Sequence, residues 1–278
     1  MPELATAVES LSLVIEIGGM PVRVHTTDPD FLAMLQDRYA GFVTSADSAA
    51  SAEIDFDIDL TSPGSADPDA DVRVTHQQGR WTLTRGDFRA EWEPVLRRGW
   101  IRQTANPYSI DAVLRIVHTL VLARQGGFLL HSASAIRNGK AFLFAGVSEA
   151  GKTTISRLAP PDVTLLTDEI SYVRKNGRRD DAGYIAFGTP FTGELAKLGE
   201  NVSARVAALY LLAKGSENRI DPVPPGEAAR SLLANLLFFA QDEELVQSTF
   251  HAAFEFVSRV PIARLTFVPD ARIWELIR

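Results

Sequence analysis

The sequence predicts an α/β fold preceded by a strand-rich N-terminal domain of the α+β type. From residue 107 onward, apolar segments of strand length alternate with segments of helical periodicity, as in α/β sheets. Before residue 107, strand patterns predominate and only one helix is expected. A boundary is expected at Asn106-Pro107, because proline disfavours helical backbone in the residue before it. We therefore expect two domains, residues 1–106 and residues 107–278.

Composition excludes several classes of function. The chain has 278 residues, of which 46% are hydrophobic, so it can bury a substantial core. Its net charge of −7 is spread without basic runs, which disfavours nucleic acid or an anionic membrane as partner. It has no cysteine, so disulfides, thiolate zinc sites and cysteine nucleophiles are excluded. Without an apparent signal segment or apolar span, we expect a soluble cytoplasmic protein, and leave open whether it forms a homo-oligomer.

The first domain is predicted from four segments. Residues Leu11–Ile17 form an apolar run of strand length, and Asp28–Tyr39 is the one expected helix. In residues 54–60, apolar side chains alternate with three aspartates, which predicts a half-buried strand with its acids facing water rather than binding calcium. A hairpin is expected around Arg85–Asp87. The role of this domain is not predicted.

The second domain opens with a long amphipathic helix. Ser109 is placed to cap it, apolar residues recur at helical spacing, and Gly126-Gly127 ends it. His118 lies beside the apolar stripe and is interpreted as a helix residue rather than a catalyst. The other expected strands are Phe128–Ile136, Lys140–Ala145, Val163–Thr167, Ala207–Leu212 and Ala263–Val268; helices are expected from Thr153, over Glu227–Phe239 and over Glu243–Val257; and hairpin turns are expected at Arg137-Asn138-Gly139 and Lys175-Asn176-Gly177.

A phosphate-binding loop is predicted at Gly146–Thr153. The segment has the spacing of glycine, four residues, then glycine, lysine and a hydroxyl residue, and it follows a strong strand. Backbone N–H groups of such a loop point at phosphate oxygens, while Lys152 reaches the β and γ phosphates and Thr153 offers its hydroxyl to Mg²⁺. Glu149 stands where many such loops have glycine, which brings a negative charge toward an anion site. The residues expected to bind ATP or another nucleoside triphosphate are Gly146, Ser148, Glu149, Ala150, Gly151, Lys152, Thr153 and Thr154.

Two acids at a strand end complete the predicted site. The apolar strand that includes Leu165-Leu166 ends in Asp168-Glu169, shortly after the loop. Such a strand end lies beside the phosphate loop in an α/β sheet. One carboxylate can hold Mg²⁺, and the other can accept the proton of an attacking hydroxyl or complete the metal shell.

Together these segments resemble a known kinase family. Leu130-His131, Gly146–Thr154, Thr167–Glu169 and, more loosely, Gly188–Phe191 with Glu194 are similar to the HPr kinase/phosphorylase C-terminal domain and to related kinase-like proteins of peptide-modification gene clusters. These share a P-loop core with ATP-dependent phosphoenolpyruvate carboxykinase. The resemblance covers roughly residues 128–212.

The resemblance implies ATP- and Mg²⁺-dependent phosphorylation of a hydroxyl, serine in that family, on a small protein or peptide. It implies Asp168 as catalytic base, His131 as a residue that orients the base or phosphate, and Glu194 as a further acid near the metal. With Lys152 these are the expected catalytic residues, and Thr153 with the acids Asp168, Glu169 and Glu194 are the expected metal ligands. Ser132 and Glu149 replace glycines of that family, so the substrate is not assumed to be HPr.

Three functions follow from these features. The leading one is a hydroxyl kinase, and whether it also catalyses the reverse dephosphorylation is left open. The second is a nucleotide-sensing ATP-binding module with little or no turnover. The third, a carboxykinase for a small metabolite, requires a cluster of basic residues that is not seen near the motif. Arg205 and Arg219 are interpreted as surface arginines.

Overall fold

The chain divides into two compact units. The computed structural model of the protein describes residues 10–44, 52, 54–62, 67–147, 149–177, 183–193 and 199–278. The first unit is Met1–Leu114 and the second is Arg115–Arg278, so the boundary falls inside helix α2 (Pro107–Gln125). The boundary expected from the sequence, at Asn106-Pro107, lies at the start of the same helix.

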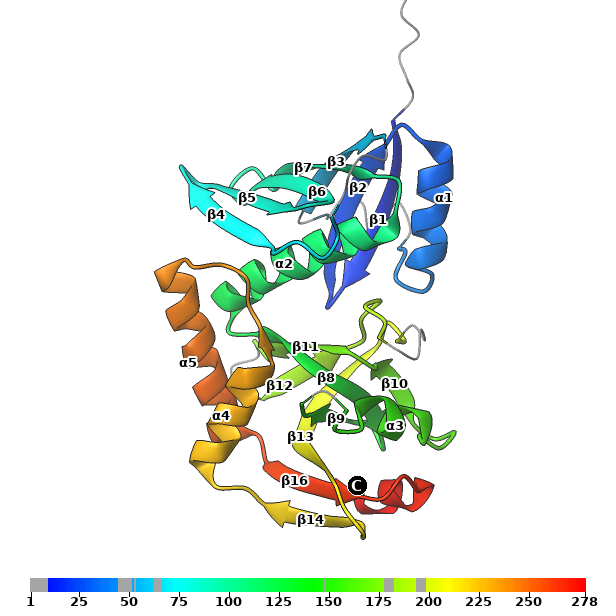
Figure 1. Cartoon of the computed structure of the whole chain (residues 1–278), viewed down its shortest axis with the longest axis vertical. Helices are drawn as coiled ribbons and strands as arrows, with labels where there is room; N and C mark the ends of the chain where they lie inside the picture. The colour runs from blue at the N-terminus through cyan, green and yellow to red at the C-terminus, as the bar shows by residue number, and fades with distance from the viewer. Residues whose placement is uncertain are drawn as a thin grey trace, which may run out of the picture. The chain divides into compact units, whose positions relative to one another are not determined.

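The first unit is built on a seven-stranded sheet with the order β1-β2-β3-β7-β6-β5-β4. Neighbouring strands are antiparallel except the pairs β2–β3 and β3–β7. Figure 1 shows helix α1 beside β1, and contacts between these two elements confirm this position. The elements are β1 (Leu11–Ile17), β2 (Met20–Thr26), α1 (Pro29–Arg38), β3 (Ile54–Thr61), β4 (Arg73–Gln77), β5 (Arg80–Arg85), β6 (Phe88–Glu93) and β7 (Arg98–Thr104).

Strand β3 confirms the predicted alternation. Its apolar side chains, such as Phe56, are buried. Two of its aspartates form ion pairs with arginines of β7. Asp57 accepts a hydrogen bond from Arg98 at 2.9 Å, and Asp59 accepts one from Arg102 at 2.8 Å. Since β7 lies in register beside β3, the outer face of the sheet carries cross-strand ion pairs.

Helix α2 starts one turn earlier than the predicted cap. The side chain of Asn106 accepts hydrogen bonds from the backbone N–H groups of Tyr108 and Ser109, at 2.9 and 3.0 Å. Asn106 therefore caps the helix, with proline as the first helical residue. The hydroxyl of Ser109 is buried and donates instead to Asp87, at 2.7 Å. The helix ends as predicted, with Gly126 in the left-handed conformation at φ +71°.

The second unit is built on a nine-stranded sheet. Its main path has the order β10-β8-β11-β12-β13-β16-β14, with β15 paired to β8 and β9 paired to both β8 and β13. None of the described helices is long and apolar enough to cross a membrane. The elements are β8 (Phe128–Arg137), β9 (Lys140–Ala145), α3 (Lys152–Arg157), β10 (Thr164–Thr167), β11 (Ile170–Lys175), β12 (Tyr184–Phe187), β13 (Ser203–Lys214), β14 (Arg219–Pro222), α4 (Pro225–Asn235), β15 (Leu236–Leu237), α5 (Glu243–Arg259), β16 (Ile262–Phe267) and the 3₁₀ helix η2 (Ala271–Leu276).

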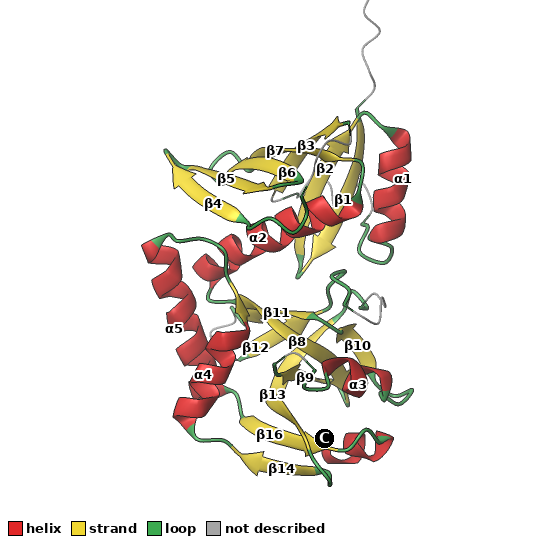
Figure 2. Cartoon of the chain, in the orientation of Figure 1, coloured by secondary structure: helices red, strands yellow, loops and turns green. Residues whose placement is uncertain are grey.

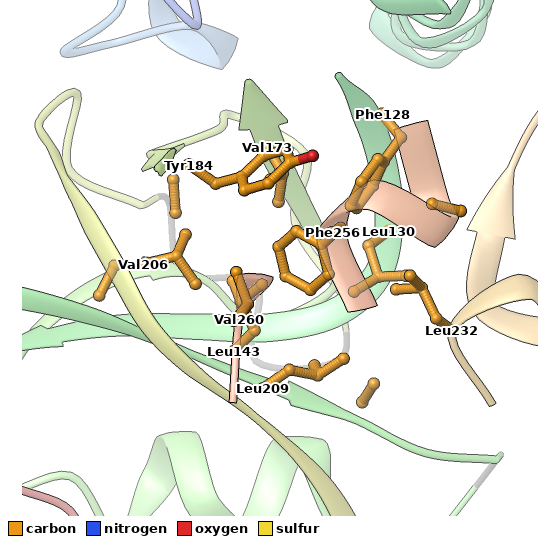
Figure 3. Packing of buried hydrophobic residues seen from close by; sticks show 14 of the residues in the cluster. Phe128, Leu130, Leu143, Val173, Tyr184, Val206, Leu209, Leu232, Phe256 and Val260 are labelled. Atoms are coloured by element: carbon orange, nitrogen blue, oxygen red, sulfur yellow. The ribbon is translucent and has the colours of Figure 1, made fainter. Parts of the chain in front are cut away.

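Each face of this sheet has its own core. On β9, Leu143 joins the cluster that packs on α4 and α5, whereas Phe142 and Phe144 join the cluster that packs on α3 and η2. This follows from the alternation of side chains along a strand. Figure 1 shows α4 and α5 on one side of the sheet and α3 on the other. In Figure 3, the ring of Phe256 from α5 lies between Phe128 and Tyr184, with ring centroids 5.2 and 4.9 Å away.

The expected α/β fold class is wrong. The described residues are rich in strands, as Figure 2 shows, and do not form the P-loop α/β core of the expected kinase class. Within the nine-stranded sheet, only the pairs β9–β13 and β13–β16 are parallel among the described strands. Consecutive strands such as β8 and β9 are joined by tight turns, which make them antiparallel. A helical crossover is needed only for parallel pairs, so the turn between β8 and β9, which the sequence predicted as a hairpin, needs none.

Candidate functional site

The predicted phosphate-binding segment follows β9, and its last two residues, Lys152 and Thr153, begin α3. A Cβ at Gly146 would lie 2.6 Å from the side chain of Ala150, so only glycine fits where the loop leaves the strand. Gly151 has φ +113°, and a Cβ there would lie 2.6 Å from the ring of Phe267. Both motif glycines are therefore required by the loop's shape.

Glu149 adopts an uncommon backbone conformation in this loop. Its φ of 62° lies in the left-handed region, which non-glycine residues seldom occupy. Its side chain is exposed and lines the cavity described below. Ser148, predicted beside it as a phosphate-binding residue, lies outside the described residues. The loop therefore carries both backbone strain and a negative charge at one position.

The side chain of Lys152 contacts the backbone at the start of the same segment. Its ammonium group donates a hydrogen bond to the carbonyl oxygen of Gly146, at 3.0 Å. It also donates to the carbonyl oxygen of Val147, at 3.5 Å. Thr153 and Thr154 follow in the first turn of α3 and are half-buried.

The turn between β10 and β11 positions the two predicted acids. The hydroxyl oxygen of Thr167 accepts hydrogen bonds from the backbone N–H groups of Glu169 and Ile170, at 3.2 and 3.1 Å. This hydroxyl turn fixes the backbone of Asp168 and Glu169. Thr167 was expected only as the end of a strand and as part of the family resemblance, although a threonine before two acids at a strand end is a recognisable turn pattern.

Asp168 is anchored by a glycine from a distant part of the chain. The backbone N–H of Gly193 donates to Asp168 Oδ1 at 2.9 Å, and the Asp168 side chain is buried. A Cβ at Gly193 would lie 3.0 Å from Glu169 Cβ and 3.2 Å from Asp168 Oδ2. Glu194, predicted as a metal ligand, lies outside the described residues.

His131 reaches the same site from β8. Its neighbour Ser132 pairs with Ala145, the residue before the loop, and His131 itself pairs with Ile170 of β11. Its side chain is exposed. Surrounding protein atoms lower the pKa of His131 below its ordinary value, and the positive charges of Lys152 and Arg115 lower it further. The imidazole is therefore neutral at pH 7.

These residues line one cavity of about 460 Å³. This volume lies within the range of ~300–1,000 Å³ typical of ligand pockets. The cavity brings together most of the predicted site residues, and it adds two that were not predicted, Gly193 and Lys214. Its walls are formed by His131, Glu149, Gly151, Lys152, Thr153, Thr154, Asp168, Glu169, Gly193 and Lys214.

Lys214 lies two residues beyond the strand predicted at Ala207–Leu212, and only strand pairing brings it to the site. It is the last residue of β13, which runs parallel to β9, the strand before the loop. The carboxyl ends of parallel neighbours lie at the same edge of a sheet, so a basic residue there faces the phosphate loop. Arg205 and Arg219 line no part of the cavity, and Arg219 pairs with Glu217 and Asp221.

Arg115 of α2 lies close to Glu169 and to the ring of Phe191. Its guanidinium carbon lies 5.0 Å from the ring centroid of Phe191, and its Nη2 atom lies 3.9 Å from Glu169 Oε2. In the sequence, the residues on either side of Arg115 predict only the apolar face of a helix. The charge of Arg115 was missed because a single arginine on a helix carries no distinguishing pattern.

The oxygen ligands at the site suit an Mg²⁺ ion that is also bound by the substrate. Within the described ranges, no three histidine, aspartate or glutamate side chains gather into a cage for a metal ion. Thr153, Asp168 and Glu169 nevertheless line the same cavity. Mg²⁺ prefers oxygen ligands and commonly uses one or two carboxylates, with water and phosphate oxygens completing its shell. The residues present therefore fit this ion.

Comparison with known families places this site in a defined group. The profile of the SynChlorMet cassette protein ScmC matches residues 102–278, which is more than half of the chain. The chain belongs to the ScmC family. The ScmC match includes every residue of the cavity described above, whereas residues 1–101 lie outside it. Among curated proteins, none matches the chain.

The ScmC match corrects the family expected from the sequence. The resemblance to the HPr kinase/phosphorylase domain and to phosphoenolpyruvate carboxykinase is wrong, because the matching family is ScmC and no kinase family is found. The resemblance relied on a few short motifs, and such motifs recur at sites on unrelated folds. What the site does must therefore be argued from its own geometry.

Proposed function

We propose that this site binds a nucleoside triphosphate with Mg²⁺ and transfers its terminal phosphoryl group to a hydroxyl of an acceptor. The observation that carries the proposal is the cavity that Lys152 and Thr153 line together with Asp168 and His131. A loop shaped by two required glycines supplies a phosphate site, and a buried acid supplies a base. Phosphoryl transfer needs mainly these parts, because its catalysis rests on positioning and charge stabilisation.

The loop and two lysines account for phosphate binding. Lys152 at the loop and Lys214 at the end of β13 line the same cavity. Two ammonium groups compensate the negative charge of a triphosphate and bind its oxygens through charge-assisted hydrogen bonds. The motif glycines let the backbone N–H groups of the loop approach the phosphates closely. We infer ATP as the donor.

Thr153, Asp168 and Glu169 would hold the Mg²⁺ ion. When bound, Mg²⁺ neutralises charge that develops on the phosphate oxygens. The backbone of Thr153 lies in the first turn of α3, and the Thr167 turn fixes the backbone of the two acids. The chain's own contribution would be to supply three oxygen ligands that line the same cavity.

Asp168 is the proposed base. Gly193 holds one of its carboxylate oxygens, and its side chain is buried, so its position is well defined. It would accept the proton of the acceptor hydroxyl as that oxygen bonds to the terminal phosphorus. His131, neutral at pH 7, would orient the hydroxyl or the transferred group by a hydrogen bond.

Glu149 favours a second function, a nucleotide-sensing module with little turnover. Its negative charge lines the cavity, and its left-handed backbone stores strain in the loop. Both features weaken phosphate binding and leave the loop less well matched to a transition state. Nucleotide binding without phosphoryl transfer would favour this function over the first.

Calorimetric titration with ATP and Mg²⁺ tests the proposal. Wild type should bind the nucleotide, and Lys152→Met should weaken binding by about tenfold or more, because charge-assisted hydrogen bonds are lost. Lys140→Met is the matched control, since Lys140 is exposed at the opposite end of β9. Phosphate release is then measured on the same samples. Absence of nucleotide binding by wild type would refute both functions.

We infer a small protein or peptide as the partner that carries the acceptor hydroxyl. Because ATP is the donor, we also infer that the protein works in the cytoplasm. The chain's net charge of −7 gives no electrostatic basis for binding nucleic acid.

A further inference from the structure

A second cavity of about 200 Å³ adjoins the candidate site. His131 and Glu169 line both cavities, so the two meet at these side chains. The second one is smaller than the ~300 Å³ at which pockets for drug-sized ligands begin. A single side chain or a small acid fits it, and a nucleotide does not. The rest of its wall is formed by Arg115, Ile170, Ala234, Asn235, Leu236 and Leu237.

Arg115 is the only cation in this wall among the described residues. Its Nη2 atom forms a loose ion pair with Glu169 Oε2, at 3.9 Å, which is beyond hydrogen-bond distance. Its Nε atom is buried and has no hydrogen-bond partner within the described part of the chain. An unsatisfied buried donor on a charged group is costly unless a ligand pairs with it. A carboxylate matches the guanidinium, which can bind it through two parallel hydrogen bonds.

Another part of the wall is apolar, and backbone pairing fixes its position. Leu236 and Leu237 of β15 pair antiparallel with Leu130 and Leu129 of β8. This pairing sets β15 directly beside the strand that carries His131. The cavity therefore offers one charged contact and an aliphatic surface next to the phosphoryl-transfer site.

We propose that this second cavity binds the phosphoryl acceptor, a hydroxyl compound that also carries a carboxylate, and that Arg115 pairs with this carboxylate. The inference rests on the proposed function. The acceptor's hydroxyl then lies at the border formed by His131 and Glu169. Its oxygen forms a bond to the terminal phosphorus, the bond to the β–γ bridging oxygen breaks, the hydroxyl proton passes to Asp168, and a nucleoside diphosphate leaves.

Two kinds of molecule carry both a hydroxyl and a carboxylate, and one assay distinguishes them. The first is a peptide in which an acidic residue lies near a serine or threonine. The second is a small free hydroxy acid. Degenerate peptide mixtures with a central serine or threonine, and with one flanking position fixed as Asp/Glu or as Asn/Gln, are compared with glycerate, N-acetylserine and their amides. Transfer of label from terminally labelled ATP is measured with Mg²⁺.

The expected result is at least tenfold greater labelling of acid-bearing acceptors than of matched amides. Arg115→Met keeps an aliphatic chain over Phe191 but removes the charge, so it should abolish this preference while leaving ATP binding unchanged within about twofold. Arg115→Lys should restore part of it. Arg124→Met, an exposed arginine in the last turn of the same helix, is the control that should behave as wild type.

Three outcomes would overturn the acceptor site. One is equal labelling of acids and amides by wild type, and another is an acid preference that survives in Arg115→Met. The third is ATP turnover without transfer of label to any acceptor. This result would contradict the acceptor site but not the nucleotide site. Failure of wild type to bind ATP would instead refute the proposed function itself.

Discussion

The backbone N–H of Gly193 donates a hydrogen bond of 2.9 Å to Oδ1 of the buried Asp168. The two residues come from different segments, one following β12 and the other following β10. The contact orients the carboxylate that we propose as the base. The space beside the acid is also tight, because a Cβ at Gly193 would lie 3.2 Å from Asp168 Oδ2 and would require a small shift of that side chain.

Gly193→Ala should therefore impair turnover more than nucleotide binding. The added methyl group must displace the carboxylate, and we expect phosphoryl transfer to fall about tenfold, as misplaced catalytic groups commonly lose rate by this factor or more. Gly177→Ala is the matched control, since a Cβ there would meet nothing within 4 Å. Steady-state rates with ATP and Mg²⁺ measure the effect. Equal rates in the two variants would argue against Asp168 as the base.

Lys214 should contribute to nucleotide affinity although it lies outside the glycine-rich motif. Lys214→Met removes one cation from the cavity, and we expect the dissociation constant for ATP to rise about tenfold at low salt. Because the side chain is exposed, the effect should shrink at high ionic strength. Calorimetry at two salt concentrations tests this. A response no larger than that of Lys140→Met would contradict the assigned role.

Glu149 should weaken binding through its charge and through its backbone. Glu149→Gln removes the charge and should tighten ATP binding severalfold. Glu149→Gly also releases the left-handed strain at φ 62°, of roughly 1 kcal/mol or more, and should bind at least as tightly as the glutamine variant. Calorimetry on the three proteins separates the two effects. Identical affinities would show that the side chain does not face the phosphates.

His118 should make the protein sensitive to acid. It is fully buried, neither ring nitrogen has a hydrogen-bond partner within the described residues, and burial lowers its pKa to about 3. The unfolded chain, with a histidine pKa of about 6.5, therefore binds the proton first as the pH falls. The stability from this group is complete above pH ~6.5 and is lost toward pH ~3, at up to about 1.4 kcal/mol per pH unit.

Denaturant unfolding between pH 7 and pH 4 measures this dependence. His118→Leu should remove this part of the slope, so that its unfolding free energy gains on that of wild type as the pH falls. His251→Leu, at an exposed position on α5, should keep the wild-type slope. Parallel curves for wild type and His118→Leu would show that the buried imidazole is not the acid-sensitive group.

Most elements could be predicted because their patterns are local. The alternation in residues 54–60, the turn at Asn138-Gly139 and the glycines that end α2 each depend on neighbours in the chain, and all three are confirmed. The cap of α2 was misassigned from Asn106 to Ser109 because both residue types cap helices. Only the burial of Ser109 against Asp87 excludes it.

Strand direction and fold class could not be predicted in the same way. An apolar strand pattern is the same whether the neighbouring strand is parallel or antiparallel, so the alternation with helices suggested an α/β core that the structure does not have. The family resemblance failed for a related reason. Short motifs report the chemistry of a site, and they do not report the fold or family that carries it.

The amino-acid sequence by itself determined the candidate chemistry, because loop glycines, a lysine, a hydroxyl and two acids have functions set by their side chains and local spacing. Only the tertiary structure decided which residues share a cavity with them. Arg115, Gly193 and Lys214 join the site or its border from a helix, a loop and a distant strand end. Strand pairing and side-chain packing determine which distant segments meet, and these depend on the whole fold rather than on any one segment.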